Sequence, residues 1–348
     1  MNNTNSPVRV GVIGLGMMGG THLDAYAKMD HVRVVAVADR DPDRLSGKAS
    51  AAGNIEGQAK GGFDLTDPDL HKHVEAQDLI DDPDVDVVDI CLPTPLHLPI
   101  GLASLNAGKH TLVEKPLART FAEAQQLADA AEKAWQQHQA VSMCAMCMRF
   151  WPGWDWLKDA VTQQTYGPVR AANFRRVAQF PGGPFYSNGQ ASGGAILDLH
   201  IHDSDFVRHL FGQPQSVHSA GYTKVTGQTD HVLTRYEFPP DTAGLADHAI
   251  VAAEGSWCLA DGFGFSMRYT VNFEHATADF DLARGPAALQ LHHQGKTTDV
   301  QLDPAMGYDH ELAYFIDCVR QGRPADRVTL RDAGQSVQLV EQEIQSIG

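Results

Sequence analysis

The segment RVGVIGLGMMG, residues 9–19, places an apolar run directly before three glycines in the spacing G-x-G-x-x-G. Residues 9–13 predict a buried strand, and the residues after the last glycine predict a helix. Gly14 permits a tight turn, Gly16 lets backbone amides approach a pyrophosphate, and Gly19 lets helix and strand pack closely. In this strand–loop–helix context the spacing predicts a dinucleotide-binding loop. Its expected cofactor contacts are Gly14, Leu15, Gly16, Met17, Met18 and Gly19.

An acidic residue ends the second predicted strand. Residues 32–38 form that strand, and Asp39 follows it, 20 residues beyond Gly19. A carboxylate at this place can bond both ribose hydroxyls and repels a 2′-phosphate, which favours NAD over NADP. The neighbouring Arg40 argues the other way, because an arginine could pair with that phosphate. We therefore expect NAD, with NADP as the alternative, and both side chains as cofactor contacts.

Two further strand ends carry candidate residues. The segment TLVEKPL, residues 111–117, is an apolar strand that ends in an acid, a base and a proline. Proline ends the strand ladder, so Lys115 is delivered at the mouth of a sheet as a candidate proton donor or acceptor. The alternative is a strand that ends in a solvated ion pair. The segment PTPLH, residues 93–97, ends the preceding strand, so its residues Pro93, Thr94 and His97 are expected near the cofactor.

Strands and helices alternate through the first 145 residues, which predicts a doubly wound parallel sheet of the α/β class. From Gly167 onward strands follow one another without helices between most of them, so they are expected to pair antiparallel in a large open sheet. A free face of such a sheet is a plausible subunit interface. The predicted domains are 1–145 and 146–348, with the last helix able to pack back on the first. The expected later strands are 168–178, 216–225, 230–238, 247–259, 265–273 and 276–283.

One helix, from Gly193 to about residue 211, interrupts this run of strands. On a regular helix Asp198 and His202 lie on one face, while His200 points almost oppositely. A D-x-H-x-H metal site is therefore disfavoured. The pair suits a carboxylate that orients an imidazole acting as general base, and a simple i,i+4 helix pair is the alternative.

Other segments are less informative. Residues 44–52 and 70–80 are expected as helices, with a loose glycine-rich stretch at 53–62 between them. On the second helix His71 and His73 are two residues apart, too far round to share a ligand. Three tryptophans near the domain junction could stack on a sugar, although core packing is the more common role of such residues. They are Trp151, Trp154 and Trp156.

The composition excludes several classes of protein. With 348 residues the chain exceeds the size of one core, so two domains are expected. A net charge of -16 argues against nucleic acid and anionic membranes as partners. No signal peptide or membrane span is predicted, and five cysteines without framework spacing indicate a reducing cytoplasm. Cys144 and Cys147 form a C-x-x-C that is expected to be packed thiols rather than a redox pair.

Together these motifs resemble the Gfo/Idh/MocA family of NAD(P)-dependent sugar and polyol oxidoreductases. The resemblance spans nearly the whole chain and is carried by the glycine loop, T-P-x-H at 94–97, E-K-P at 114–116, the spaced Gly193, Gly194, Asp198 and His202, and the helix 308–320. It implies an N-terminal Rossmann domain, a C-terminal α+β domain with a large open sheet, and homodimers or homotetramers.

The resemblance also implies roles for individual residues. Lys115 and His202 would form the acid/base pair at the reacting hydroxyl, with Asp198 holding substrate and histidine. Glu114 would position the cofactor ribose, and His97 would lie beside the nicotinamide. Two positions depart from the family pattern: Leu96 replaces a polar residue, often asparagine, and His200 replaces a small residue and could add a contact at the pocket rim. The stretch 53–78 also looks longer than usual.

These expectations combine into a hydride transfer between a nicotinamide and a hydroxyl of a sugar or polyol. The expected substrate contacts are Lys115, Cys147, Arg149, Asp198 and His202. No metal is expected. Two alternatives stay open: a glycoside hydrolase that retains NAD and acts by oxidation and elimination, and a non-catalytic nucleotide-sensing regulator.

Overall fold

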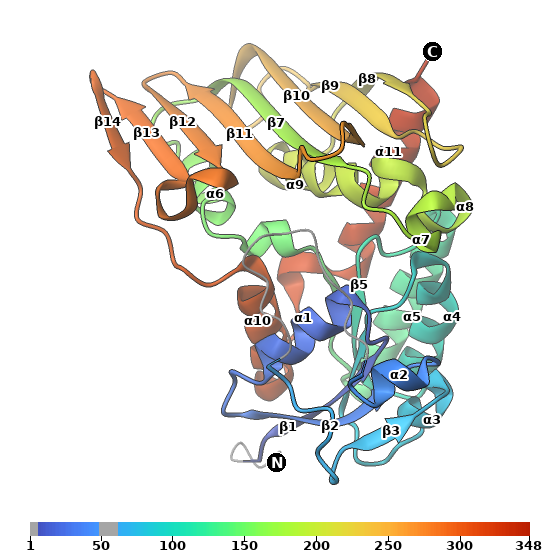
Figure 1. Cartoon of the computed structure of the whole chain (residues 1–348). Helices are drawn as coiled ribbons and strands as arrows, with labels where there is room; N and C mark the ends of the chain where they lie inside the picture. Colours follow the sequence, from blue (N-terminus) through green and yellow to red (C-terminus); the bar gives the residue numbers. More distant parts are fainter. Residues whose placement is uncertain (1–5, 49–61) are drawn as a thin grey trace. The chain divides into compact units, whose positions relative to one another are not determined.

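The computed structural model describes residues 6–48 and 62–348, and the chain divides into two compact units. Unit 1 comprises residues 1–146 and 308–335, and unit 2 comprises residues 147–307 and 336–348. Each unit contains one sheet (Figure 1). The glycine-rich stretch 53–62 lies almost entirely outside the described residues, as does the end of the predicted helix 44–52. The described part of that helix is a single short turn at its start.

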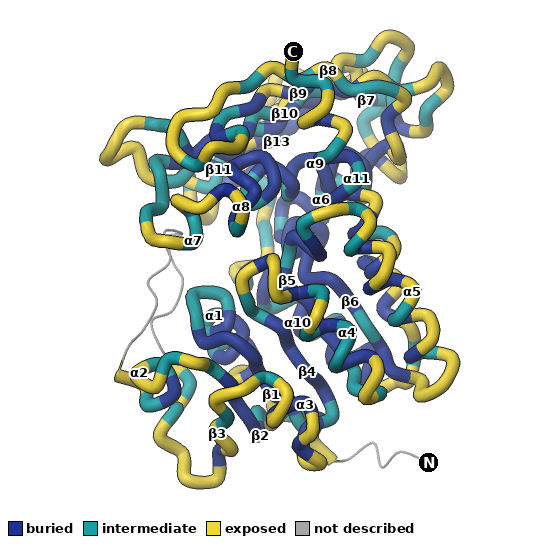
Figure 2. Tube along the Cα trace, turned by 90° about the vertical axis from the view of Figure 1, so that its right-hand side faces the viewer, coloured by how far each residue is buried: buried dark blue, intermediate teal, exposed yellow. Residues whose placement is uncertain are grey.

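Unit 1 is built on a six-stranded sheet in the order β3-β2-β1-β4-β5-β6, and all neighbouring strands in it are parallel. This order confirms the predicted doubly wound fold. The central strand β4 is buried at all four of its residues, as expected of a strand covered on both faces (Figure 2). The strands are β1 (Val8–Ile13), β2 (Val32–Ala38), β3 (His71–His73), β4 (Val87–Ile90), β5 (His110–Glu114) and β6 (Ser142–Ala145).

Helices cover both faces of this sheet. Figure 1 shows α1 and α10 on one side of it and the neighbouring helices α4 and α5 on the other. The chain returns to unit 1 through α10 after passing through unit 2, and α11 contributes residues to both units. The helices are α1 (Met17–Tyr26), α2 (Pro42–Leu45), α3 (Ala76–Ile80), η1 (Thr94–Leu96), α4 (His97–Asn106), α5 (Phe121–His138), α10 (Gly307–Gln321), η5 (Asp326–Val328) and α11 (Leu330–Ser346).

The helical prediction for residues 70–80 is wrong at its beginning. His71 and His73 lie in the short edge strand β3, which pairs with β2, and the helix begins only at Ala76. Residues two apart in a strand point to the same side. Both imidazoles therefore reach one carboxylate, that of Asp82, at 2.7 and 3.3 Å. The expectation that these two histidines cannot share a partner is corrected accordingly.

Unit 2 contains an eight-stranded sheet in the order β14-β13-β12-β11-β7-β10-β9-β8. Only β7 and β10 pair in parallel, and the other pairs are antiparallel, which confirms the predicted large, mostly antiparallel sheet. Two short strands at one edge were not predicted. The strands are β7 (Val169–Gln179), β8 (Ser216–Tyr222), β9 (His231–Glu237), β10 (Leu245–Leu259), β11 (Phe265–Phe273), β12 (Ala276–Asp281), β13 (Leu289–His293) and β14 (Lys296–Asp299).

One face of this sheet packs against α6 and α9 (Figure 1). Trp154 on α6 is fully buried among aromatic rings of the strands and of α9, so its predicted core role holds. On the other face, alternate residues of β9 are exposed. The helices are η2 (Cys147–Phe150), α6 (Trp154–Thr162), α7 (Pro184–Ser187), α8 (Gly189–Ser192), the π-helix η3 (Ile196–His200), α9 (Ile201–Phe211) and η4 (Leu282–Ala287).

Among the described residues, no helix combines the length and the apolar character that a membrane crossing needs. All five cysteines lie among the described residues and are in the thiol form. Cys144 and Cys147 are both buried, as expected for packed side chains.

Candidate cofactor and proton-transfer site

The three glycines of the loop after β1 have different surroundings. A Cβ on Gly14, whose φ is +94°, would lie 2.5 Å from the carbonyl oxygen of Cys91, and one on Gly19 would lie 1.8 Å from the carbonyl oxygen of Gly14. A Cβ on Gly16 would meet nothing within 4 Å. The outer two glycines are therefore required by close packing within the protein, whereas the space beside the middle one is open to a ligand.

The N-terminus of α1 suits an anion. Gly16 is its N-cap, no side chain caps it, and its first turn carries no acidic residue. Unpaired backbone N–H groups and the helix dipole at such an end favour a phosphate. Met17 and Met18, which open the helix, are half-buried. The loop therefore fits the pyrophosphate of a dinucleotide.

Asp39, at the end of β2, is held against this loop. One of its carboxylate oxygens accepts a hydrogen bond of 2.7 Å from the backbone N–H of Leu15. The other accepts one of 2.8 Å from the backbone N–H of Asp41. Arg40 points to a different partner, since its guanidinium pairs with Glu75 at 2.8 Å and is 79% exposed. The carboxylate thus lies beside the glycine loop, where the sequence predicts the ribose contact.

Lys115 follows β5 at the same carboxyl-terminal edge of the sheet as the glycine loop. Its backbone N–H donates a hydrogen bond of 2.8 Å to the carboxylate of Glu114, and the peptide bond to Pro116 is cis. The lysine is half-buried, and Glu114 is only 4% exposed. A buried acid that accepts a backbone hydrogen bond differs from the solvated ion pair that was the alternative prediction.

His97 does not lie open to a ligand. It is fully buried, and its ring nitrogens lie 2.8 Å from the carbonyl oxygen of Pro116 and 2.7 Å from that of Leu92. Burial lowers the pKa of its imidazole, against the opposing effect of these two carbonyls. The ring therefore connects the segment after β4 to the E-K-P turn, and its place beside a nicotinamide stays a prediction. Thr94 in the same loop is buried, and Leu96 is 40% exposed.

The sequence analysis did not predict a buried cluster of polar side chains that includes Glu114, the last residue of β5. Nδ1 of His22 lies 2.8 Å from a carboxylate oxygen of Asp89, and its Nε2 lies 3.2 Å from one of Glu114. Glu311, from α10, completes the cluster. His22, inside a helix, and Glu311, 289 positions later, carry no common local signal, so only the fold could reveal them.

In unit 2 the segment that carries Asp198 and His202 is not a regular helix. Residues 196–200 form a π-helix, and His202 lies in the first turn of α9. A π-turn widens the helix and changes the angles on which the prediction of a shared face rested, and such turns are frequent at functional sites. Both side chains are half-buried.

His200 lies in the core of unit 2, and not at the pocket rim where the family resemblance placed it. It is fully buried, with Nε2 3.4 Å from a carboxylate oxygen of Glu343 and 3.4 Å from the hydroxyl of Tyr236. It is thus a core histidine of unit 2, held by residues of β9 and α11.

The two predicted substrate contacts near the start of unit 2 are also buried. Arg149 donates from Nε and Nη2 to the two carboxylate oxygens of Asp205, at 2.8 and 2.6 Å. Cys147 is 3% exposed. This bidentate pair favours a core role for Arg149 over direct contact with substrate. The acid/base and substrate assignments for unit 2, and the convergence of Lys115 with His202, stay predictions.

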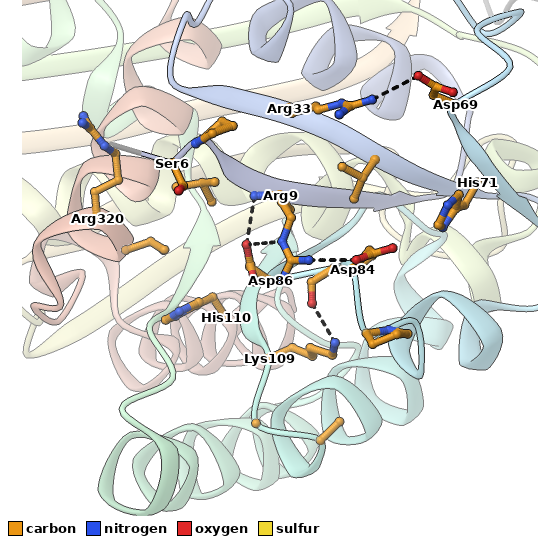
Figure 3. Close-up of a pocket in the computed structure, with 18 residues that line it drawn as sticks. Ser6, Arg9, Arg33, Asp69, His71, Asp84, Asp86, Lys109, His110 and Arg320 are labelled. Carbon is orange, nitrogen blue, oxygen red and sulfur yellow. Dashed lines mark hydrogen bonds and ion pairs between the residues drawn. The ribbon is translucent and has the colours of Figure 1, made fainter. Parts of the chain in front are cut away.

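A cavity of about 940 Å³ opens at the opposite, amino-terminal edge of the unit 1 sheet (Figure 3). Two of its cations, Arg9 and Lys109, already have partners. Arg9 pairs with Asp84 and Asp86 at 3.0 and 2.7 Å, and Lys109 donates to the carbonyl oxygens of Asp82 and Val85. Ligands of open parallel sheets bind at the carboxyl edge, so this cavity is not the candidate site.

Comparisons with known proteins agree with this geometry. Residues 8–141 match the Gfo/Idh/MocA model described as an oxidoreductase family with an NAD-binding Rossmann fold, and residues 154–279 match the Gfo/Idh/MocA C-terminal domain. A myo-inositol 2-dehydrogenase of Thermotoga maritima is 27% identical over 91% of this chain and 90% of its own length. A levoglucosan dehydrogenase of Pseudarthrobacter phenanthrenivorans is 31% identical over 63% of this chain and 54% of its own length.

Solved structures show the same fold. A levoglucosan dehydrogenase in complex with NADH and levoglucosan superposes with a TM-score of 0.80 at 21% identity, covering 98% of this chain and 97% of that one. These comparisons lend no support to the glycoside hydrolase or to the regulator. The two matched domains, in the order that the sequence predicts, establish that the chain belongs to the Gfo/Idh/MocA family of NAD(P)-dependent oxidoreductases.

Proposed function

We propose that the protein is an NAD-preferring dehydrogenase that interconverts a hydroxyl and a carbonyl group of a sugar or polyol. The observation that carries this proposal is the carboxyl edge of the unit 1 sheet, where the open space beside Gly16 and the half-buried Lys115 occur together. The relatives named above act, by their names, on an inositol and an anhydrosugar, which supports this class of substrate.

The cofactor would be held by the loop from Gly14 to Gly19, by Asp39 and by the residues that follow β4 and β5. Preference for NAD is supported by the carboxylate of Asp39, which would repel a 2′-phosphate. Arg40, the residue that argued for NADP, is engaged with Glu75. When bound, the nicotinamide accepts a hydride from the substrate carbon or returns one in the reverse direction.

The protein's own part in the reaction is to position the substrate and move a proton. We propose that His202 takes the proton of the reacting hydroxyl with the assistance of Lys115, while Asp198 orients the imidazole. A lysine ammonium close to that oxygen stabilises negative charge as the proton leaves. Such acid/base help typically contributes about 10²- to 10⁴-fold in rate.

The direct experiment is a panel of polyols, aldoses and anhydrosugars, assayed with NAD and with NADP by the absorbance of the reduced nicotinamide. We expect turnover of at least one compound, faster with NAD. Absence of turnover of every compound with both cofactors, by protein that binds NADH, would contradict the proposal. Cleavage of an aryl glycoside without net reduction of NAD would also contradict it, and would restore the hydrolase alternative.

We also propose that the open face of the eight-stranded sheet joins two copies of the chain. Tyr222, Leu233 and Ile250 lie on that face, by the strand registers, and are 51%, 48% and 60% exposed. Apolar side chains on an uncovered sheet face mark an interaction surface. Light scattering after size exclusion should show a homo-oligomer that Leu233→Lys with Ile250→Lys dissociates. A monomeric parent protein would contradict this.

A further inference from the structure

Four ionisable side chains from four separate elements meet in the core of unit 1. His22 comes from α1, Asp89 from β4, Glu114 from β5 and Glu311 from α10. Three of them are 0% exposed, and Glu114 is 4% exposed. Three carboxylates and one imidazole in a space without solvent need positive charge for balance, because an unpaired buried charge is strongly destabilising.

The two ring nitrogens of His22 have different neighbours, and only Nε2 faces Glu114. Nδ1 lies 2.8 Å from Asp89, which also accepts the hydroxyl of Tyr26 at 3.0 Å. A neutral imidazole that donates from Nδ1 presents a lone pair at Nε2. A histidine held by a carboxylate on one nitrogen while the other is bare is the usual arrangement of a metal ligand.

The bare nitrogen faces two further acceptors. Nε2 of His22 approaches an oxygen of Glu114 at 3.2 Å but has no hydrogen-bond partner, so the contact lacks hydrogen-bond alignment. Both carboxylate oxygens of the fully buried Glu311 also lack a hydrogen-bond partner. One ligand atom from each of the three residues lies within 4.8 Å of the others. Three electron-pair donors therefore converge with no donor hydrogen aligned between them.

Protons are one possible source of the missing positive charge. Protonated forms of His22 and Glu311 would, however, leave a buried N–H and O–H without aligned acceptors in this arrangement. A metal ion bound at 2.0–2.2 Å would satisfy all three groups, and ligand atoms around a tetrahedral ion lie about 3.3–3.6 Å apart, close to the observed contact.

We propose that unit 1 holds a divalent first-row metal ion, with Zn²⁺ the best match to the donors, bound by Nε2 of His22 and the carboxylates of Glu114 and Glu311. Because the ligands are buried, the ion would enter during folding and resist chelators in the native protein. The second oxygen of Glu114 accepts the backbone N–H of Lys115, so the ion would brace the strand end that carries the lysine. The proposal does not depend on the proposed function.

A second cluster of the same residue types serves as a control. His71, His73 and Asp82 also lie close enough to hold an ion. Here both imidazoles already bond the carboxylate, and the side chain of His71 is 47% exposed. This cluster has ordinary partners and carries no proposal.

The first test is the metal content of the full chain. Protein is unfolded in denaturant with EDTA, freed of both, and refolded with or without Zn²⁺. We expect about one ion per chain only in the refolded sample that received Zn²⁺, with a higher Tm. X-ray absorption should show a shell of nitrogen and oxygen atoms at about 2.0–2.1 Å without sulfur. Fewer than about 0.1 ions per chain, or a zinc–sulfur shell at about 2.3 Å, would overturn the proposal.

The second test assigns the ligands. Glu311→Gln keeps the shape of the side chain and removes its charge, and should lower the bound metal at least tenfold after refolding with limiting Zn²⁺. His73→Gln, in the control cluster, should retain the full content. If Glu311→Gln bound as much metal as the parent protein, the assignment of Glu311 as a ligand would be overturned. If the variant does not fold, the metal content and absorption spectrum of the parent protein decide alone. Loss of dehydrogenase activity has no bearing on this outcome.

Discussion

One carboxylate oxygen of Glu114 accepts the backbone N–H of Lys115 at 2.8 Å, while the other lies 3.2 Å from Nε2 of His22. The acid that precedes the lysine therefore connects the strand end to the buried interior of unit 1. His97 holds the other side of the same turn through the carbonyl oxygen of Pro116. The backbone around Lys115 is thus fixed from two directions, as the proposed role of Lys115 in proton transfer would require.

Lys115→Ala should lower kcat by about 10²- to 10⁴-fold, because the variant loses the ammonium that we propose assists proton transfer. The Kd for NADH should change by less than about threefold, because the proposed role of this side chain is in the transition state and not in cofactor binding. Lys133→Ala, at an exposed position on α5, is the matched control and should behave as the parent. Turnover equal to that of the parent would remove Lys115 from the mechanism.

Gly16→Ala should raise the Kd for NADH at least tenfold, because the new methyl group enters the space predicted for the pyrophosphate. Stability should hardly change, since that methyl group meets no protein atom within 4 Å. Gly20→Ala, on the same helix and equally open, is the control and should bind NADH normally. Fluorescence titration with NADH and thermal unfolding distinguish the two variants. Unchanged affinity in Gly16→Ala would place the cofactor elsewhere.

Asp39→Asn should raise the ratio of kcat/KM with NADP to that with NAD by about 10- to 100-fold. Removing one negative charge close to a 2′-phosphate would relieve a repulsion of about 1–3 kcal/mol, if the effective dielectric constant lies between those of protein and water. Arg40→Ala should leave the ratio unchanged, because this arginine pairs with Glu75. If Arg40→Ala changed this ratio and Asp39→Asn did not, the cofactor assignment would be reversed.

Asp205→Asn should destabilise the protein at neutral pH and progressively less in acid. Burial alone would raise the pKa of Asp205, but Arg149 and the other donors outweigh it and lower the pKa to about 2. A carboxylate whose pKa is lower in the folded state stabilises above its unfolded pKa of about 3.9, and loses that contribution as the pH falls towards 2. The contribution is about 2–3 kcal/mol.

Urea unfolding of the parent and of Asp205→Asn between pH 7 and 3 checks this dependence. The gap in free energy of unfolding should stay constant above about pH 5 and narrow below it. Asp261→Asn, at an exposed turn position, should track the parent throughout. A gap that widens in acid would show that the ion pair with Arg149 does not control the titration of Asp205.

Prediction from sequence succeeded where the signal was local. The glycine loop, the strand that ends in Glu114 and Lys115, and the alternation of strands and helices depend on short spacings, which fix turn geometry and the periodicity of buried residues. Prediction failed where contacts between residues far apart in the sequence determine the local structure. Residues 71–73 form a strand because they pair with β2 and share Asp82, and the π-turn at 196–200 has no periodic signature.

By itself, then, the sequence determined the fold class, the dinucleotide loop and the identity of Lys115, Asp198 and His202 as candidates. The tertiary structure alone decided which polar residues are buried together. His22 and Glu311 are 289 positions apart, yet α1 and α10 bring them to the same carboxylate of Glu114. Local spacing cannot encode such a meeting, because it arises only when helices from both ends of the chain pack on one face of the sheet.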